Sequence, residues 1–125
     1  MSNWKTWKSP YELFAGDELK IAEKIQQRRY QMLIHSCIYY ELADNYISDT
    51  QWNTWAHELA DLQNKYPNIS KEVTLFEYFK DWDGSSGAFL PIKLPWVVQK
   101  AKTLLQYRDA RPQQREVTMK KKKLF

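Results

Sequence analysis

Five residues near the middle of the chain combine aromatic rings with small polar side chains. Tyr39 and Tyr40 come near the end of one predicted helix, and Asp49, Trp52 and Asn53 lie in the first turns of the next. A short connection between two helices brings both sets to one corner of a helical hairpin. Such a grouping suits a planar, charged small molecule. We therefore predict a ligand or partner site at this corner.

A second group of candidate binding residues is basic and lies toward the C-terminus. Residues 98–125 hold nine Lys and Arg against two acidic residues, whereas residues 1–97 hold ten against thirteen. The last helix and the tail therefore carry the positive charge and could contact phosphate without sequence preference. The candidate nucleic-acid-binding residues are Lys100, Lys102, Arg108, Arg111, Arg115, Lys120, Lys121, Lys122 and Lys123. The alternative is a solvated tail that aids solubility.

Two long helices are predicted to position the aromatic corner. The first covers 17–43, a stretch that contains neither Gly nor Pro. The second covers 48–65, where Ser48 and Gln51 fit a capping box and Pro67 follows as a stop signal. Because only about four residues join them, the two helices should pack as an antiparallel pair.

Shorter elements complete an all-α fold. A short helix is predicted over 10–14, where proline occupies the first helical position. The aromatic segment 70–82 is predicted as a second helix, and 95–107 as the last one, which also begins with proline. The sequence Asp-Gly-Ser-Ser-Gly at 83–87 predicts a loop between them. Both shorter helices should pack across the hairpin.

The composition is typical of one compact domain. Of 125 residues, 43% are hydrophobic and only three are glycine, which argues against a turn-rich all-β fold. We divide the chain into an aromatic leader (1–16), a helical domain (17–107) and a flexible basic tail (108–125). The single cysteine, Cys37, excludes an internal disulfide and fits a reducing compartment. Since we find neither a signal pattern nor an apolar run near the roughly 18 residues of a membrane helix, we expect a cytoplasmic protein without membrane association.

The residues of the predicted hairpin keep the spacing of a known family. In one register they are His35, Tyr39, Tyr40, Asp44, Asn45, Ile47, Asp49, Trp52 and Asn53, followed by Glu58, Leu59, Tyr66 and Pro67. Over residues 20–67 the chain resembles, without a gap, the N-terminal helical domain of bacterial NAD-dependent DNA ligases. In that family the domain holds the nicotinamide mononucleotide half of NAD. The resemblance therefore implies NAD or nicotinamide mononucleotide as the ligand.

The match to the family is incomplete at the site itself. Tyr39 and Asp49 agree with the family in type, and Trp52 replaces a tyrosine but could still stack on a nicotinamide ring. Tyr40 stands where the family has histidine, and Asn53 where it has aspartate. These two departures change the hydrogen-bonding groups offered to a nucleotide and remove one charge. The alternative is that the shared hairpin is kept while its ligand site has been lost or given another use.

Catalysis of ligation is not expected from this chain. Nucleotidyl transfer needs a lysine nucleophile in a K-x-D-G motif, and the nearest match, Lys80 to Gly84, is one residue too long. His35 and His57 have no partners at zinc-ligand spacing, so we predict no metal site, and His35 is interpreted as a packing residue.

The segment 79–91, FKDWDGSSGAFLP, brings the resemblance closest to small ligase-related proteins of bacteriophages and prophages. We therefore expect a non-catalytic, phage-type accessory protein of DNA metabolism. One alternative is an interaction module that modulates a host or phage protein, such as a ligase, a clamp or a defence factor. The other is a protein that binds nucleic acid weakly and non-specifically.

Overall fold

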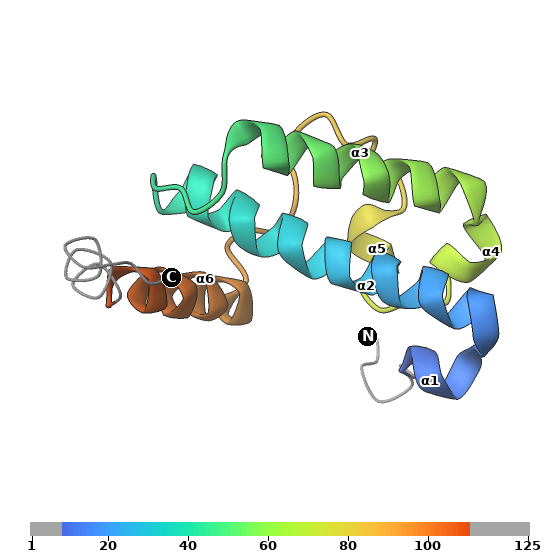
Figure 1. The fold of residues 1–125 in the computed structure, drawn as a ribbon. Coiled ribbons are helices and arrows are strands. Elements are labelled where there is room, and N and C mark those ends of the chain that lie inside the picture. Colours follow the sequence, from blue (N-terminus) through green and yellow to red (C-terminus); the bar gives the residue numbers. More distant parts are fainter. Residues whose placement is uncertain (1–8, 111–125) are drawn as a thin grey trace, which may run out of the picture.

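The computed structural model describes residues 9–110, which fold into helices joined by turns and loops (Figure 1). No strand occurs within this range, which confirms the predicted all-α class. In chain order the helices are α1 (Pro10–Leu13), α2 (Gly16–Ser36), the π-helical turn η2 (Cys37–Glu41), α3 (Asp49–Lys65), α4 (Pro67–Ser70), α5 (Phe76–Phe79) and α6 (Pro95–Asp109).

The antiparallel hairpin is the framework of the fold. Helices α2 and α3 lie side by side and run in opposite directions (Figure 1). Ser48 caps α3 as predicted, because its hydroxyl accepts a hydrogen bond from the Gln51 backbone N–H at 3.0 Å. Helix α3 ends at Lys65, since Pro67 disfavours helical geometry in the residue before it. Pro67 then begins the short helix α4, so the predicted stop is also a new start.

The first long helix changes its geometry before it ends. After α2, residues 37–41 form η2, in which the Leu42 N–H donates to the Cys37 carbonyl oxygen at 3.0 Å. The helix stops at Glu41, two residues short of the predicted end, and Ala43 adopts a left-handed conformation with φ +52°. Single π-helical turns are rare and occur often at functional sites. Here the turn carries Tyr39 and Tyr40.

Ala43→Gly should make the protein more stable. Glycine adopts a positive φ without the clash that the alanine Cβ makes, so we expect the free energy of unfolding to rise by about 0.5–1 kcal/mol in urea denaturation. Ala110 is a matched control, because it also terminates a helix but has φ −77°. Ala110→Gly should bring no gain, and an equal gain at both positions would contradict this explanation of Ala43.

The predicted helix over 70–82 is wrong in extent, because beyond Ser70, the last residue of α4, only α5 (Phe76–Phe79) is helical there. The guanidinium of Arg29, in α2, donates hydrogen bonds to backbone carbonyl oxygens that would accept from N–H groups in such a helix. Its Nη1 donates to the oxygens of Val73 at 2.8 Å and Thr74 at 3.0 Å, and its Nη2 donates to that of Ser70 at 3.1 Å. Leu75 then turns the chain with φ +75°. A buried arginine has thus replaced the hydrogen bonds of a longer helix.

Helix α6 closes the other side of the framework. It contacts α2 and η2, and in Figure 1 it lies on the side of α2 away from α3. It continues to Asp109, two residues past the predicted end, so Arg108 belongs to a helix and not to a tail. Within residues 9–110, no helix combines the length and apolar character that crossing a bilayer requires. The core between these helices includes the buried residues Ile25, Leu33, Ile38, Leu59, Phe79 and Val97.

Candidate functional site

The five residues of the predicted ligand site line one pocket at the hairpin corner. Two of them, Tyr39 and Tyr40, come from η2, and the other three, Asp49, Trp52 and Asn53, come from the first turns of α3. The pocket has a volume of about 230 Å³. That is less than the roughly 300–1,000 Å³ of sites that enclose drug-sized ligands. It suits one aromatic ring with part of a sugar. The other lining residues are His35, Asn45, Tyr46, Ile47, Ser48 and Ser85.

The aromatic rings of the pocket differ in how firmly they are held. Tyr39 and Tyr40 are 56% and 45% exposed and meet edge to face, with their ring centroids 4.9 Å apart. Trp52 is half-buried: its ring lies edge to face with Trp82 at 6.2 Å, and its Nε1–H donates to the Ser36 hydroxyl at 3.3 Å. The site therefore offers one fixed indole and two accessible phenol rings, which can contact a flat ligand.

The loop 83–87 adds a further side to the pocket, which the sequence did not predict. Ser85 lines the pocket, and the Ser86 hydroxyl lies 3.3 Å from the Tyr40 hydroxyl. Gly87 permits this approach, because a Cβ there would overlap the Ser36 hydroxyl and come within 3.2 Å of the Trp52 ring. The usable signal in the sequence was the pair of glycines that brackets the two serines.

His35 both packs within the hairpin and lines the pocket. The side chain is only 8% exposed, and it lies between the rings of Tyr46 and Trp55, with centroid distances of 5.9 and 5.7 Å. Burial lowers the pKa of His35 to about 4, so the imidazole is neutral near pH 7. Within the described residues its Nδ1 is buried without a hydrogen-bond partner. A buried nitrogen of this kind is costly unless something else satisfies it.

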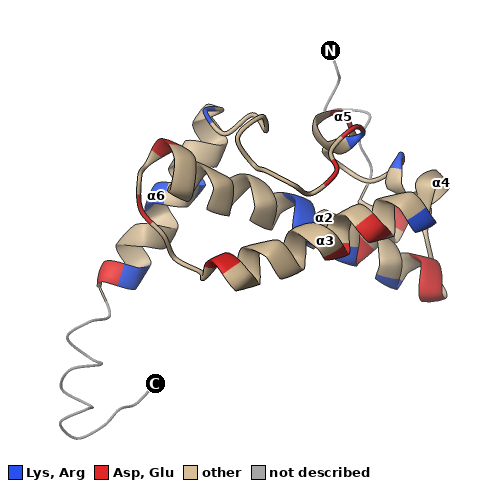
Figure 2. Cartoon of the chain, turned by 90° about the horizontal axis from the view of Figure 1, so that it is seen from above, with Lys and Arg blue, Asp and Glu red and all other residues tan. Residues whose placement is uncertain are grey.

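The electrostatic character of the corner is acidic. The sequence contains no Lys or Arg between Tyr30 and Asn64, and Figure 2 shows acidic positions on the α2–α3 connection and at the start of α3. Of the described residues that line the pocket, Asp49 alone carries a formal charge near pH 7. It makes no ion pair within residues 9–110.

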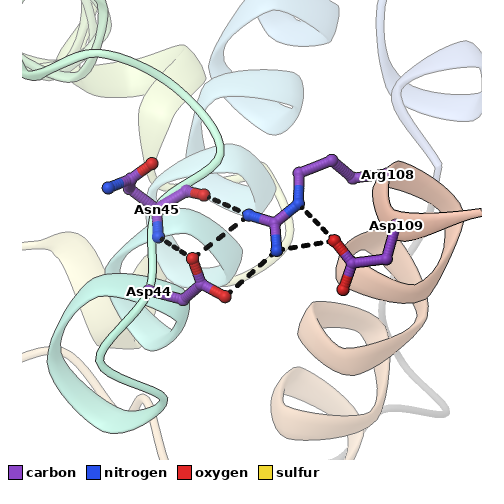
Figure 3. Close-up of polar contacts among 4 residues, drawn as sticks. All are labelled: Asp44, Asn45, Arg108 and Asp109. Atoms are coloured by element: carbon purple, nitrogen blue, oxygen red, sulfur yellow. Dashed lines mark hydrogen bonds and ion pairs between the residues drawn. The ribbon is translucent and has the colours of Figure 1, made fainter. Parts of the chain in front are cut away.

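An arginine that contacts the pocket residue Asn45 is bound to acidic groups (Figure 3). Arg108 at the end of α6 binds both carboxylate oxygens of Asp44 at 3.1 Å, and it donates to the carbonyl oxygen of Asn45 at 2.6 Å. Its Nε also donates to Asp109 at 2.8 Å. Hydrogen bonds from the Arg108 side chain and then from the Asn45 N–H lower the pKa of Asp44. Arg108 therefore ties α6 to the α2–α3 connection. The sequence led us to expect that it contacts phosphate, but in the structure its donors are occupied by Asp44, Asn45 and Asp109.

The structure describes little of the predicted nucleic-acid surface. Lys100 and Lys102 are exposed on α6. The other candidates besides Arg108 lie outside the described residues: Arg111, Arg115, Lys120, Lys121, Lys122 and Lys123.

Comparison with known proteins leaves the pocket to be interpreted from its own chemistry. No protein-family model matches the chain, and neither a curated protein nor a solved structure does. The resemblance to the ligase domain therefore stays a prediction from residues 20–67.

Proposed function

We propose that this protein is a non-catalytic accessory factor of DNA metabolism, of the phage type related to NAD-dependent DNA ligase. It binds the nicotinamide end of a nicotinamide nucleotide at the hairpin corner. The observation that supports the proposal is the convergence of Tyr39, Tyr40, Asp49, Trp52 and Asn53 on one pocket that fits a single ring with part of a sugar. In the sequence these residues are divided between two helices.

The residues have distinct roles in the proposed complex. The nicotinamide ring packs against Trp52, which the Ser36 hydroxyl and the Trp82 ring already hold in place. The carboxamide exchanges hydrogen bonds with the side-chain amide of Asn53. The adenylate half of NAD lies outside a pocket of this volume.

The two departures from the ligase pattern have a local explanation in this proposal. Tyr40, which stands in place of a histidine, has its hydroxyl near the hydroxyl of Ser86, so its role is to join the corner to the loop 83–87. Asn53, in place of an aspartate, keeps an oxygen acceptor and gains an amide donor. Both remain compatible with a neutral carboxamide as the partner.

Thermal unfolding with added nucleotides tests the proposal. Nicotinamide mononucleotide and NAD should both raise the melting temperature, whereas AMP should not. At about 100 times the dissociation constant, the ligand adds roughly 2.7 kcal/mol, which corresponds to several degrees for a domain of this size. If AMP shifts the transition as much as the mononucleotide does, or if none of the three shifts it, the proposal is wrong.

Asp49→Ala provides the matched variant for the same experiment. Removing the carboxylate should weaken mononucleotide binding by about tenfold, while the loss of its favourable position in the first turn of α3 costs only about 0.5–1 kcal/mol. Asp61→Ala is the control, because Asp61 is also exposed on α3 but does not line this pocket. If both variants bind the mononucleotide as tightly as the parent protein does, Asp49 does not contribute to binding.

A further inference from the structure

We infer that the hairpin-corner pocket selects a planar aromatic cation, such as an oxidised pyridinium nucleoside, and makes no contact with a phosphate group. The inference rests on the proposed function and specifies which part and which charge state of the ligand the pocket recognises. It follows from the charges at the corner and from the exposure of the aromatic rings.

The charge of the lining favours a positive ligand. Asp49 carries the only formal charge among the described lining residues, and it has no cationic partner within residues 9–110. The rings of Tyr39, Tyr40 and Trp52 surround the same space, and aromatic faces attract cations. His35 adds no opposing charge, because it is neutral near pH 7. The oxidised nicotinamide ring is a cation, whereas the reduced dihydronicotinamide ring is neutral.

Two cations beside the corner already have acidic partners among the described residues. Arg108 is bound by Asp44 and Asp109, and Lys93 lies 4.0 Å from the carboxylate of Glu41. Within the described residues that line the pocket there is neither a lysine nor an arginine. Asp49 itself would repel a phosphate brought to the start of α3. The described lining residues therefore offer no cationic contact to the 5′-phosphate of a bound mononucleotide.

Two ligand comparisons test the inference on the full-length protein, with isothermal titration calorimetry as the readout. Nicotinamide riboside lacks the phosphate, so it should bind at least as tightly as nicotinamide mononucleotide. Reduced nicotinamide riboside lacks the ring charge, so its binding should be about tenfold weaker, from the combined loss of the cation–aromatic and carboxylate interactions. Asp49→Asn should narrow this difference between the oxidised and reduced ribosides. Asp61→Asn, in the same helix, should not.

The possible outcomes separate this inference from the proposed function. Equal affinity for the oxidised and reduced ribosides would overturn the selection of a cation, although a nicotinamide site would still exist. Binding of the mononucleotide at least tenfold tighter than the riboside would reveal a phosphate contact and overturn the claim that the pocket makes none. If neither the riboside nor the mononucleotide binds, both the inference and the proposed function are wrong.

Discussion

Replacing Arg29 by methionine should destabilise the protein by about 3–5 kcal/mol, a large part of the 5–15 kcal/mol that holds a typical domain folded. The side chain is fully buried in α2. Besides the three carbonyl groups of residues 70–74, its guanidinium donates to the Ser70 hydroxyl at 2.7 Å and to the Gln63 side-chain oxygen at 2.9 Å. Methionine fills similar space but donates no hydrogen bond, so the buried Val73 carbonyl loses its donor and the other acceptors lose a charged partner. An unsatisfied buried acceptor alone costs about 1–3 kcal/mol.

The buried cation is satisfied by oxygen dipoles and not by an opposite charge. None of the hydrogen bonds that Arg29 makes within residues 9–110 goes to a carboxylate. Burial lowers its pKa only to about 10, so it stays charged near pH 7. Removing Arg29 therefore releases the segment 70–75 from α2 and removes the reason why that segment is not helical.

Urea denaturation of a small set of variants measures this effect. Arg29→Lys should recover only part of the loss, because an ammonium group has three donors and cannot reproduce the guanidinium fork. Lys20→Met is the control, since Lys20 is exposed on the same helix, and it should change stability by less than about 0.5 kcal/mol. A loss below 1 kcal/mol in Arg29→Met would contradict the structural role given to this side chain.

Acidification should destabilise the protein in a window set by His35. Its pKa is about 4 when folded and about 6.5 when unfolded, so the unfolded chain binds more protons between these values. The free energy of unfolding should therefore be unaffected above pH 6.5, fall as pH decreases toward 4, and level off below that. The difference between the two pKa values corresponds to a decrease of up to about 3 kcal/mol in the free energy of unfolding.

Chemical denaturation at a series of pH values between 4 and 7.5 tests this expectation. His35→Phe keeps an aromatic ring between Tyr46 and Trp55 but cannot titrate, so its stability should stay flat across the window. His57→Gln is the matched control on the exposed side of α3 and should keep the slope of the parent protein. Asp44 acts in another window, because its lowered pKa places its contribution to acid unfolding below about pH 4. A parent protein without a slope between pH 4 and 6.5 would contradict the burial of His35.

The framework of the fold could be predicted because its signals are local. The cap at Ser48 and the proline at position 67 mark the ends of α3, and the short connection forces α2 and α3 into an antiparallel pair. The segment 70–82 could not be predicted in the same way. Its aromatic pattern favours a helix, but a tertiary contact from Arg29, more than 40 positions earlier, decides its conformation.

The candidate site, too, could be predicted only in part. The residues of one hairpin corner could be grouped from the sequence, since helix spacing and a short loop bring η2 and the start of α3 together. The contribution of Ser85 could not, because it depends on how Gly87 packs against Ser36 and Trp52. Arg108 reads as one more basic residue before a basic tail, and only the fold reveals that Asp44 and Asp109 bind it.

The most direct test of the proposed site is a two-dimensional amide NMR spectrum of the full-length protein, recorded during titration with nicotinamide mononucleotide. Binding at the hairpin corner should shift the amide signals of residues 39–40, 48–53 and 85, together with the indole N–H of Trp52. Residues 57–65, at the far end of α3, should not respond. If millimolar mononucleotide leaves the corner unchanged, or if the shifts gather on α6 instead, this pocket is not the nicotinamide site.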